Sequence, residues 1–167
     1  MNNLIKTNVF EMFSDRNYIY DTIDLTLDLF TIYNENNVKS IVKFVLDDNK
    51  LSQFKEIINT LLLEIDDIIN INKIFIITFN NLNYKREEIE IMNAKNFKVN
   101  ITKHIMALKH ELVSSDELIK LKEKIDIKTL PLIYTSDPMI KWYGWTSGNI
   151  CKISRPTSTY YRLIKCI

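Results

Sequence analysis

The hydrophobic pattern near the start of the chain alternates between helical and strand-like periods. From Leu4 to Phe13 apolar residues recur at helical spacing, and the polar stretch Ser14–Tyr18 is expected to end that helix. Ile23–Phe30 fits a strand and a helix equally well. Ser40–Leu46, rich in β-branched and aromatic residues, predicts a strand that a turn at Asp47–Asn49 ends.

The alternation continues further along the chain. Leu51–Ile65 carries its apolar residues on one face of a predicted helix, and Lys73–Phe79 (KIFIITF) predicts a buried strand. A short helix is expected to begin in Lys85–Met92, and Phe97–Ile101 predicts a further strand. Alternating strands and helices over residues 40–101 are typical of a small α/β domain, which we assign to residues 1–96.

The rest of the chain, residues 97–167, has a different pattern. Ser114 and Glu117 have the spacing of a capping box in front of a predicted helix. Strands are predicted over ICKIS, which begins at Ile150, and over the closing YYRLIKCI. We therefore expect α+β overall, with the α/β domain followed by a compact α+β C-terminal domain over residues 97–167.

All glycines and prolines of the chain lie in one stretch, Leu130–Pro156. Asp137-Pro138 predicts the cap and first position of a short helix, which Gly144 is expected to end. Gly148 is expected to form a turn before the next strand. This stretch is where a small domain must turn sharply several times.

The composition is that of a globular protein, with 46% hydrophobic and 26% charged residues, but the charge is unevenly spread. Residues 1–97 hold 10 Lys/Arg and 15 Asp/Glu, a net of −5, and residues 98–167 hold 12 and 6, a net of +6. The asymmetry favours two units with different partners. Two solvated surfaces that differ by chance would give the same pattern.

Several protein classes are not favoured. The most apolar window, Leu61–Phe79, is interrupted by charged residues, and the first ten residues lack the apolar core of a signal peptide, so we expect no membrane association. Two cysteines form no disulfide framework, which favours an intracellular location. The candidate metal ligands have no zinc-ligand spacing and predict no metal site: His104, His110, Cys151 and Cys166.

Carboxylates are plentiful and raise the question of a nuclease. They include Asp47, Asp48, Glu64, Asp66 and Asp67. A nuclease site would bring such groups together with a lysine at a sheet edge, and no Glu-x-Lys follows on the next strand. These carboxylates are better explained as part of a turn and of a solvent-exposed helix end than as a nuclease site. We therefore predict no catalytic residues and no cofactor.

Basic and aromatic side chains are interleaved in the second half. Such a surface suits nucleic acid, and it equally suits an acidic partner chain. The basic residues are Lys98, Lys103, Lys109, Lys141, Lys152, Arg155, Arg162 and Lys165; the aromatic ones are Trp142, Tyr143, Trp145, Tyr160 and Tyr161.

A series of motifs in the second half occurs in an order that resembles a known family. VNITKHIMALKHELVSSDEL (Val99–Leu118) is followed by Leu-Pro-x-Ile, Asp-Pro, WYG, Lys-Ile, Arg-Pro and a closing Tyr-Arg. Together they resemble the small subunit of multisubunit DNA-directed RNA polymerases that is called subunit five in eukaryotes and has a shorter counterpart in archaea. VFEMFSDRNYIY, from Val9, is similar to the opening of the eukaryotic form.

The resemblance implies a non-catalytic role, as a component of a nucleotidyltransferase complex. In the family the C-terminal domain anchors on the largest subunit, beside other polymerase subunits, and the N-terminal domain forms part of a lower jaw near downstream duplex DNA. The expected large-subunit contacts are Lys109, His110, Lys141, Trp142, Tyr143, Arg155 and Arg162, of which Trp142 and Tyr143 fit a core position equally well.

The expected contact with DNA is weak and non-specific, through Lys85 and Arg86, because the first half is negatively charged. The alternative is a free-standing nucleic-acid-binding or transcription-regulatory protein built on the same domain.

The sequence departs from the family at three places. Asn17 and Leu108 replace a glycine and a proline, and the four residues Thr157–Tyr160 replace a longer loop, which predicts a tight connection between the last two strands. Asn tolerates positive φ, so the turn at Asn17 is expected to persist. The short N-terminal domain favours a large DNA virus as source, as does the abundance of Ile, Asn and Lys, which is typical of an A/T-rich genome. A viral protein is expected in the virion and host cytoplasm, and a cellular version in the nucleus.

Overall fold

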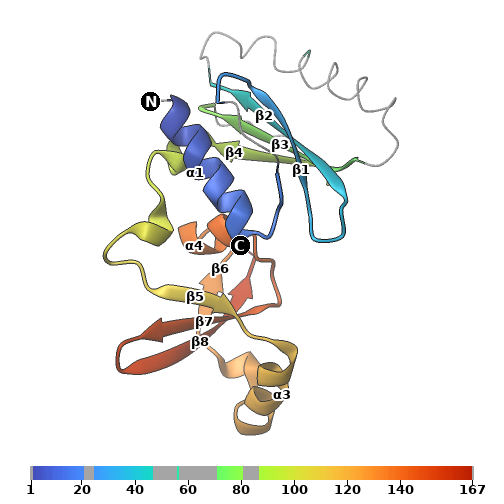
Figure 1. Cartoon of the computed structure of the whole chain (residues 1–167). Coiled ribbons are helices and arrows are strands. Elements are labelled where there is room, and N and C mark those ends of the chain that lie inside the picture. Colours follow the sequence, from blue (N-terminus) through green and yellow to red (C-terminus); the bar gives the residue numbers. More distant parts are fainter. Residues whose placement is uncertain (1, 21–24, 47–55, 57–70, 81–86, 167) are drawn as a thin grey trace. The chain divides into compact units, whose positions relative to one another are not determined.

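The computed structural model describes residues 2–20, 25–46, 56, 71–80 and 87–166, and the chain forms two compact units, Met1–Val99 and Asn100–Ile167 (Figure 1). The sequence pattern placed the division between residues 96 and 97. Phe97 stays with the first unit because its side chain is buried and its carbonyl accepts a 2.8 Å hydrogen bond from the amide of Asn8.

The first unit contains a four-stranded sheet in the order β1-β2-β3-β4. Its strands are β1 (Leu29–Tyr33), β2 (Lys39–Val45), β3 (Ile71–Thr78) and β4 (Ile89–Asn93). β1 runs antiparallel to β2, whereas β2, β3 and β4 are parallel to one another. Parallel strands together with helix α1 agree with the small α/β domain that the sequence predicted.

Helix α1 (Asn2–Asp15) lies against one face of this sheet (Figure 1). Phe10 contacts Phe30 of β1 with ring centroids 4.8 Å apart, and Phe13 contacts Phe75 of β3 at the same separation. Both pairs meet edge to face, the geometry that aromatic rings prefer. The helix predicted from Leu4 to Phe13 is therefore confirmed, and after it Asn17 adopts φ 62° in the expected turn.

Two predictions for this unit are wrong. A short helix is expected to begin in Lys85–Met92, but the last four of these residues belong to strand β4, because Ile89 and its neighbours pair with the apolar strand β3. Phe97–Ile101, expected to be a strand, instead joins two 3-10 turns, η2 (Ala94–Phe97) and η3 (Ile101–Lys103). Asn93 and Asn100 cap these turns by accepting backbone N–H bonds, an alternative to strand pairing that asparagine offers.

Other predictions fall outside the described residues. They include the turn at Asp47–Asn49 and the helix over Leu51–Ile65, of which Glu56 is described and is helical. The ambiguous segment Ile23–Phe30 ends in a strand, since Leu29 and Phe30 begin β1. The strands predicted at Ser40–Leu46 and Lys73–Phe79 are confirmed as β2 and β3.

The second unit also contains a four-stranded sheet, in the order β5-β7-β8-β6. The strands are β5 (Lys109–Leu112), β6 (Leu132–Tyr134), β7 (Ile150–Arg155) and β8 (Ser158–Lys165). β6 is parallel to β8, and the other pairs are antiparallel. The helices are α3 (Ser115–Lys124), the 3-10 turn η4 (Ile127–Thr129) and α4 (Pro138–Tyr143), so the expected α+β domain is confirmed.

The two helices cover opposite faces of this sheet. Ile140 of α4 packs with Cys151, and Leu121 of α3 packs with Ile150. Because Ile150 and Cys151 are consecutive on β7, their side chains point to opposite faces. Helix α4 therefore covers one face of the sheet, and helix α3 covers the other.

The turns of the second unit are those that the sequence predicts. Asp137 caps α4 by accepting a 2.8 Å bond from the Met139 N–H, and Pro138 is its first residue. Gly144 ends the helix with φ 68°, a left-handed conformation that glycine adopts without strain. Pro156 and Thr157 alone connect β7 to β8, which confirms the tight connection.

Candidate partner-binding surface

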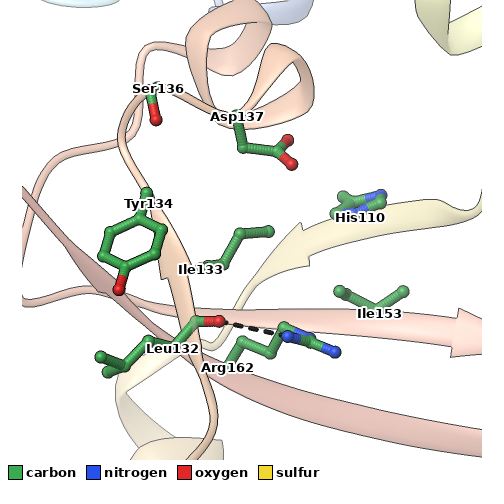
Figure 2. Close-up of a pocket in the computed structure, with 8 residues that line it drawn as sticks. All are labelled: His110, Leu132, Ile133, Tyr134, Ser136, Asp137, Ile153 and Arg162. Carbon is green, nitrogen blue, oxygen red and sulfur yellow. Dashed lines mark hydrogen bonds between the residues drawn. The ribbon is translucent and has the colours of Figure 1, made fainter. Parts of the chain in front are cut away.

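A pocket of about 430 Å³ opens on the α4 face of the second sheet (Figure 2). His110 of β5, Ile153 of β7 and Arg162 of β8 line it from the sheet. The remaining lining residues belong to β6 and to the turn that leads into α4: Leu132, Ile133, Tyr134, Ser136 and Asp137. The pocket is thus built entirely within the second unit.

Strand register explains why the sheet residues share one side. His110 pairs with Ile153, and Arg162 pairs with Cys151, two residues before Ile153 on β7. Paired residues and residues two apart lie on the same face of a sheet. Two of the predicted contact residues, His110 and Arg162, are therefore brought together although they lie far apart in the sequence.

Arg162 crosses from this face to the edge of the sheet. Its Nη1 donates a 3.1 Å hydrogen bond to the carbonyl of Leu132 on β6 (Figure 2). A guanidinium has five N–H donors in a planar fork, so one such bond leaves donors for a further acceptor in the pocket. Arg162 is partly exposed, so this guanidinium is accessible to a partner.

Two further polar groups face the pocket and are already held in place. His110 Nδ1 lies 2.8 Å from the carbonyl of Leu108, so Nδ1 carries a proton and Nε2 is the nitrogen left to face a ligand. One carboxylate oxygen of Asp137 accepts the cap bond from Met139. The pocket therefore offers a cation from Arg162, an imidazole nitrogen and a helix-capping carboxylate.

The buried thiol of Cys151 lies under the same face. Burial raises the pKa of Cys151 to about 11, with Asp137 contributing in the same direction. The thiol is therefore protonated at neutral pH and acts as a small core residue. Cys166, in contrast, is exposed near the end of β8.

The other predicted contact residues are placed separately. Lys109 forms a 2.8 Å ion pair with Glu111, and Arg155 stacks on the ring of Tyr160 at 4.8 Å. Lys141 is exposed on α4.

The two aromatic candidates differ in exposure. Trp142 is only 3% exposed, so it serves the core of the unit and offers little contact surface. Tyr143 is partly exposed and stacks on Trp145 with ring centroids 4.6 Å apart. Of the two residues that the sequence could assign to core or interface, Tyr143 alone presents a substantial surface.

A polar network on the α3 face was not predicted from the sequence. The Glu117 N–H donates to Ser114 Oγ as a capping box predicts, but the Glu117 carboxylate turns to the sheet. It accepts a 2.9 Å bond from the Tyr161 hydroxyl and pairs with Lys152 at 3.0 Å. Hydrogen bonds from Lys152 and Tyr161 lower the pKa of Glu117. In the sequence, the capping-box spacing places Glu117 at the start of the helix, but it does not show that the carboxylate also binds residues of the sheet.

The described part of the chain also bears on the expectations for metal ligands, membrane spans and DNA-proximal residues. There, no group of three or more His, Cys, Asp or Glu side chains could hold a metal ion. Likewise, no described helix is long and apolar enough to cross a membrane. Lys85 and Arg86, the expected DNA-proximal residues, lie outside the described residues, as do the carboxylates Asp47, Asp48, Glu64, Asp66 and Asp67.

Comparison with known proteins agrees with the division into units. Residues 99–165 match the family described as RNA polymerase Rpb5, C-terminal domain. The DNA-directed RNA polymerase subunit Rpo5 of Pyrococcus horikoshii is 38% identical over 80 residues, which cover 44% of this chain and 96% of that protein.

Two eukaryotic relatives extend the comparison. Subunit rpabc1 of the DNA-directed RNA polymerases I, II and III of Dictyostelium discoideum is 27% identical, with 96% of this chain and 92% of that protein aligned. Subunit 5B of the DNA-directed RNA polymerases IV and V of Arabidopsis thaliana is 29% identical over 69 residues, 40% of this chain and 32% of that protein. The ordered motifs, the α+β second unit and these relatives agree that the chain belongs to the Rpb5 family of RNA polymerase subunits, which includes archaeal Rpo5.

Proposed function

We propose that this protein is a non-catalytic subunit of a DNA-directed RNA polymerase and that its second unit attaches it to the largest subunit. The observation that carries the proposal is the coverage of the archaeal relative. A match of 80 residues spans 96% of a protein that is itself named as a polymerase subunit. A domain of this size is therefore sufficient for membership of a polymerase, and the second unit is the part of this chain that corresponds to it.

The charge of the second unit supports attachment to an acidic surface. Residues 100–167 hold 11 Lys/Arg and 6 Asp/Glu, a net of +5. Two of those acids are already paired, Glu111 with Lys109 and Glu117 with Lys152. Complementary charge speeds encounter and selects partners. Lys109, His110, Lys141, Tyr143, Arg155 and Arg162 are the contact residues that this proposal retains.

For the first unit we propose a position as part of a lower jaw near downstream duplex DNA. The alignment with the Dictyostelium subunit extends over 96% of this chain, so the first unit is included in the likeness to a polymerase subunit. The net charge of −5 over residues 1–97 opposes tight binding of phosphates. The contact with DNA would then be weak and non-specific, with Lys85 and Arg86 as the nearest cations.

Purification from the native source tests the proposal. The tagged full chain, captured from lysate under mild conditions, should recover the two large polymerase subunits in stoichiometric amount. Recovery of the chain alone would support a free-standing nucleic-acid-binding or regulatory protein on the same domain. The location would follow that of the polymerase, in virion and host cytoplasm for a viral enzyme and in the nucleus for a cellular one.

A further inference from the structure

Strand β6 forms one edge of the second sheet and presents backbone groups away from it. Leu163 N donates to the carbonyl of Pro131, and Thr135 N donates to that of Lys165. In a parallel pair alternate residues point their N–H and C=O to the partner strand. Leu132 and Tyr134 therefore direct theirs away from β8, toward a side where none of the described strands pairs with β6.

The two outward carbonyls already have donors. Arg162 Nη1 donates to that of Leu132, and the Asp137 N–H donates to that of Tyr134 at 2.9 Å. The outward N–H groups of Leu132 and Tyr134 have no strand partner in the described part of the chain. The edge is thus a donor edge, suited to the carbonyls of an added extended segment.

The pocket lies beside this edge, and Ile133 of β6 and Ile153 of β7 are among the residues that line it (Figure 2). Leu132 and Tyr134, whose backbone groups point away from β8, also have large and exposed side chains. The guanidinium of Arg162 lies beside the edge and inside the pocket. A side chain from a segment paired with β6 could therefore enter the pocket and reach Arg162.

We propose that an extended, acidic segment of another polymerase subunit adds to the edge of β6 and places one Asp or Glu carboxylate on Arg162. The inference rests on the proposed function and names the chemistry of its partner. Strand addition supplies main-chain bonds, and side chains on alternate positions supply specificity. β6 has only three residues, so the charge-assisted bond to Arg162 would contribute a large share of the affinity.

Charge favours this occupant over a second copy of the chain. A second copy would bring another unit of net charge +5 against the first, and edge pairing would place like charges close together. An acidic segment compensates that charge. Asp137 also lines the pocket, and because like charges repel, its carboxylate directs an incoming carboxylate to Arg162 and the His110 side.

Two matched pairs of variants test the edge in the full tagged chain, captured with its polymerase from native lysate and washed with increasing salt. L132P removes the outward N–H, whereas L132A shortens the same side chain and keeps it. R162Q removes the pocket cation, whereas K122Q removes an equal charge from an exposed position on α3. We expect L132P and R162Q to reduce recovery of the large subunits about tenfold, and L132A and K122Q less than about twofold.

Equal recovery with L132P and L132A, or with R162Q and K122Q, while the wild type recovers the large subunits, would overturn the strand addition and leave the proposed function standing. Failure of the wild type to recover them would overturn both. A photocrosslinking residue in place of Tyr134 gives an answer that needs no destabilising change. An adduct with an extended acidic segment of a polymerase subunit supports the proposal, and an adduct with a second copy, or none, overturns it.

Discussion

The carboxylate of Glu117 at the start of α3 accepts a 2.9 Å hydrogen bond from the hydroxyl of Tyr161 on β8. The same carboxylate pairs with Lys152 on β7 at 3.0 Å, so one side chain ties the helix to two neighbouring strands. These contacts favour the charged form of Glu117, which is why its pKa is lowered.

The first prediction concerns pH. A carboxylate whose pKa is lower in the folded protein contributes stability that is present above its unfolded pKa and is lost as pH falls through the folded value. For Glu117 the loss therefore lies below about pH 4.5, the ordinary value of its carboxyl. Thermal unfolding of wild type and E117Q should differ at pH 7, with E117Q melting roughly 2 °C lower, and the two should converge in acid.

Asp116 precedes Glu117 on the same helix and supplies a control. D116N removes a charge from the exposed first turn of α3 without touching the contacts of Glu117 with Lys152 and Tyr161. A difference between E117Q and wild type that persisted unchanged at pH 3 would show that the network acts through shape and not through charge.

The second prediction concerns a buried cation in the first unit. Lys6 of α1 is only 4% exposed, donates a 2.8 Å bond to the carbonyl of Leu25 and a further bond to Leu27, and lies 3.0 Å from Asp28. Replacement by methionine keeps the volume and leaves both carbonyls without this donor. We expect K6M to lower the free energy of unfolding by about 1–3 kcal/mol.

Asp28 is the matched control for Lys6. Its side chain is 54% exposed, so water replaces the lost ion pair and D28N should cost less than about 1 kcal/mol. Urea titrations of the two variants measure both values. Equal losses for K6M and D28N would mean that the ion pair, and not the carbonyl bonds, holds the segment against α1.

The third prediction concerns thiol reactivity. Cys151 is buried with a pKa of about 11, and Cys166 is exposed, so the thiolate that attacks a reagent at neutral pH forms far more readily at Cys166. Titration with an aromatic disulfide reagent should find one fast thiol in the native protein and two in denaturant. C166S should remove the fast thiol; rapid reaction of C166S in native buffer would contradict the burial of Cys151.

The sequence predicts most of the second unit because its signals are local. Asp137, Gly144 and Gly148 each fix a turn through their own backbone or cap chemistry, without help from distant residues. The order of the sheet is not local. Nothing near Leu132 in the sequence shows that it pairs with Leu163 or that its outer side is an edge. The family resemblance therefore implies His110 and Arg162 as contacts but not the pocket that they share.

The two wrong predictions have different physical origins. At Ile89–Asn93 the pairing with the apolar strand β3 makes the segment a strand, so a tertiary contact outweighs the local pattern. At Phe97–Ile101 an apolar and β-branched pattern favours a strand, but the local caps from Asn93 and Asn100, together with the buried ring of Phe97, favour turns.

The last prediction concerns DNA. Binding of duplex DNA depends on neutralising phosphates, and the first unit carries an excess of carboxylates, a net of −5 over residues 1–97. We expect the isolated protein to bind a random duplex no more tightly than about 10⁻⁵ M at physiological salt, in the range of non-specific contacts. Filter binding at several salt concentrations measures the affinity and its salt slope. Sub-micromolar affinity at physiological salt would be incompatible with a jaw that only lies near DNA, and K85Q with R86Q would then show whether those two cations, or the basic second unit, supply the contacts.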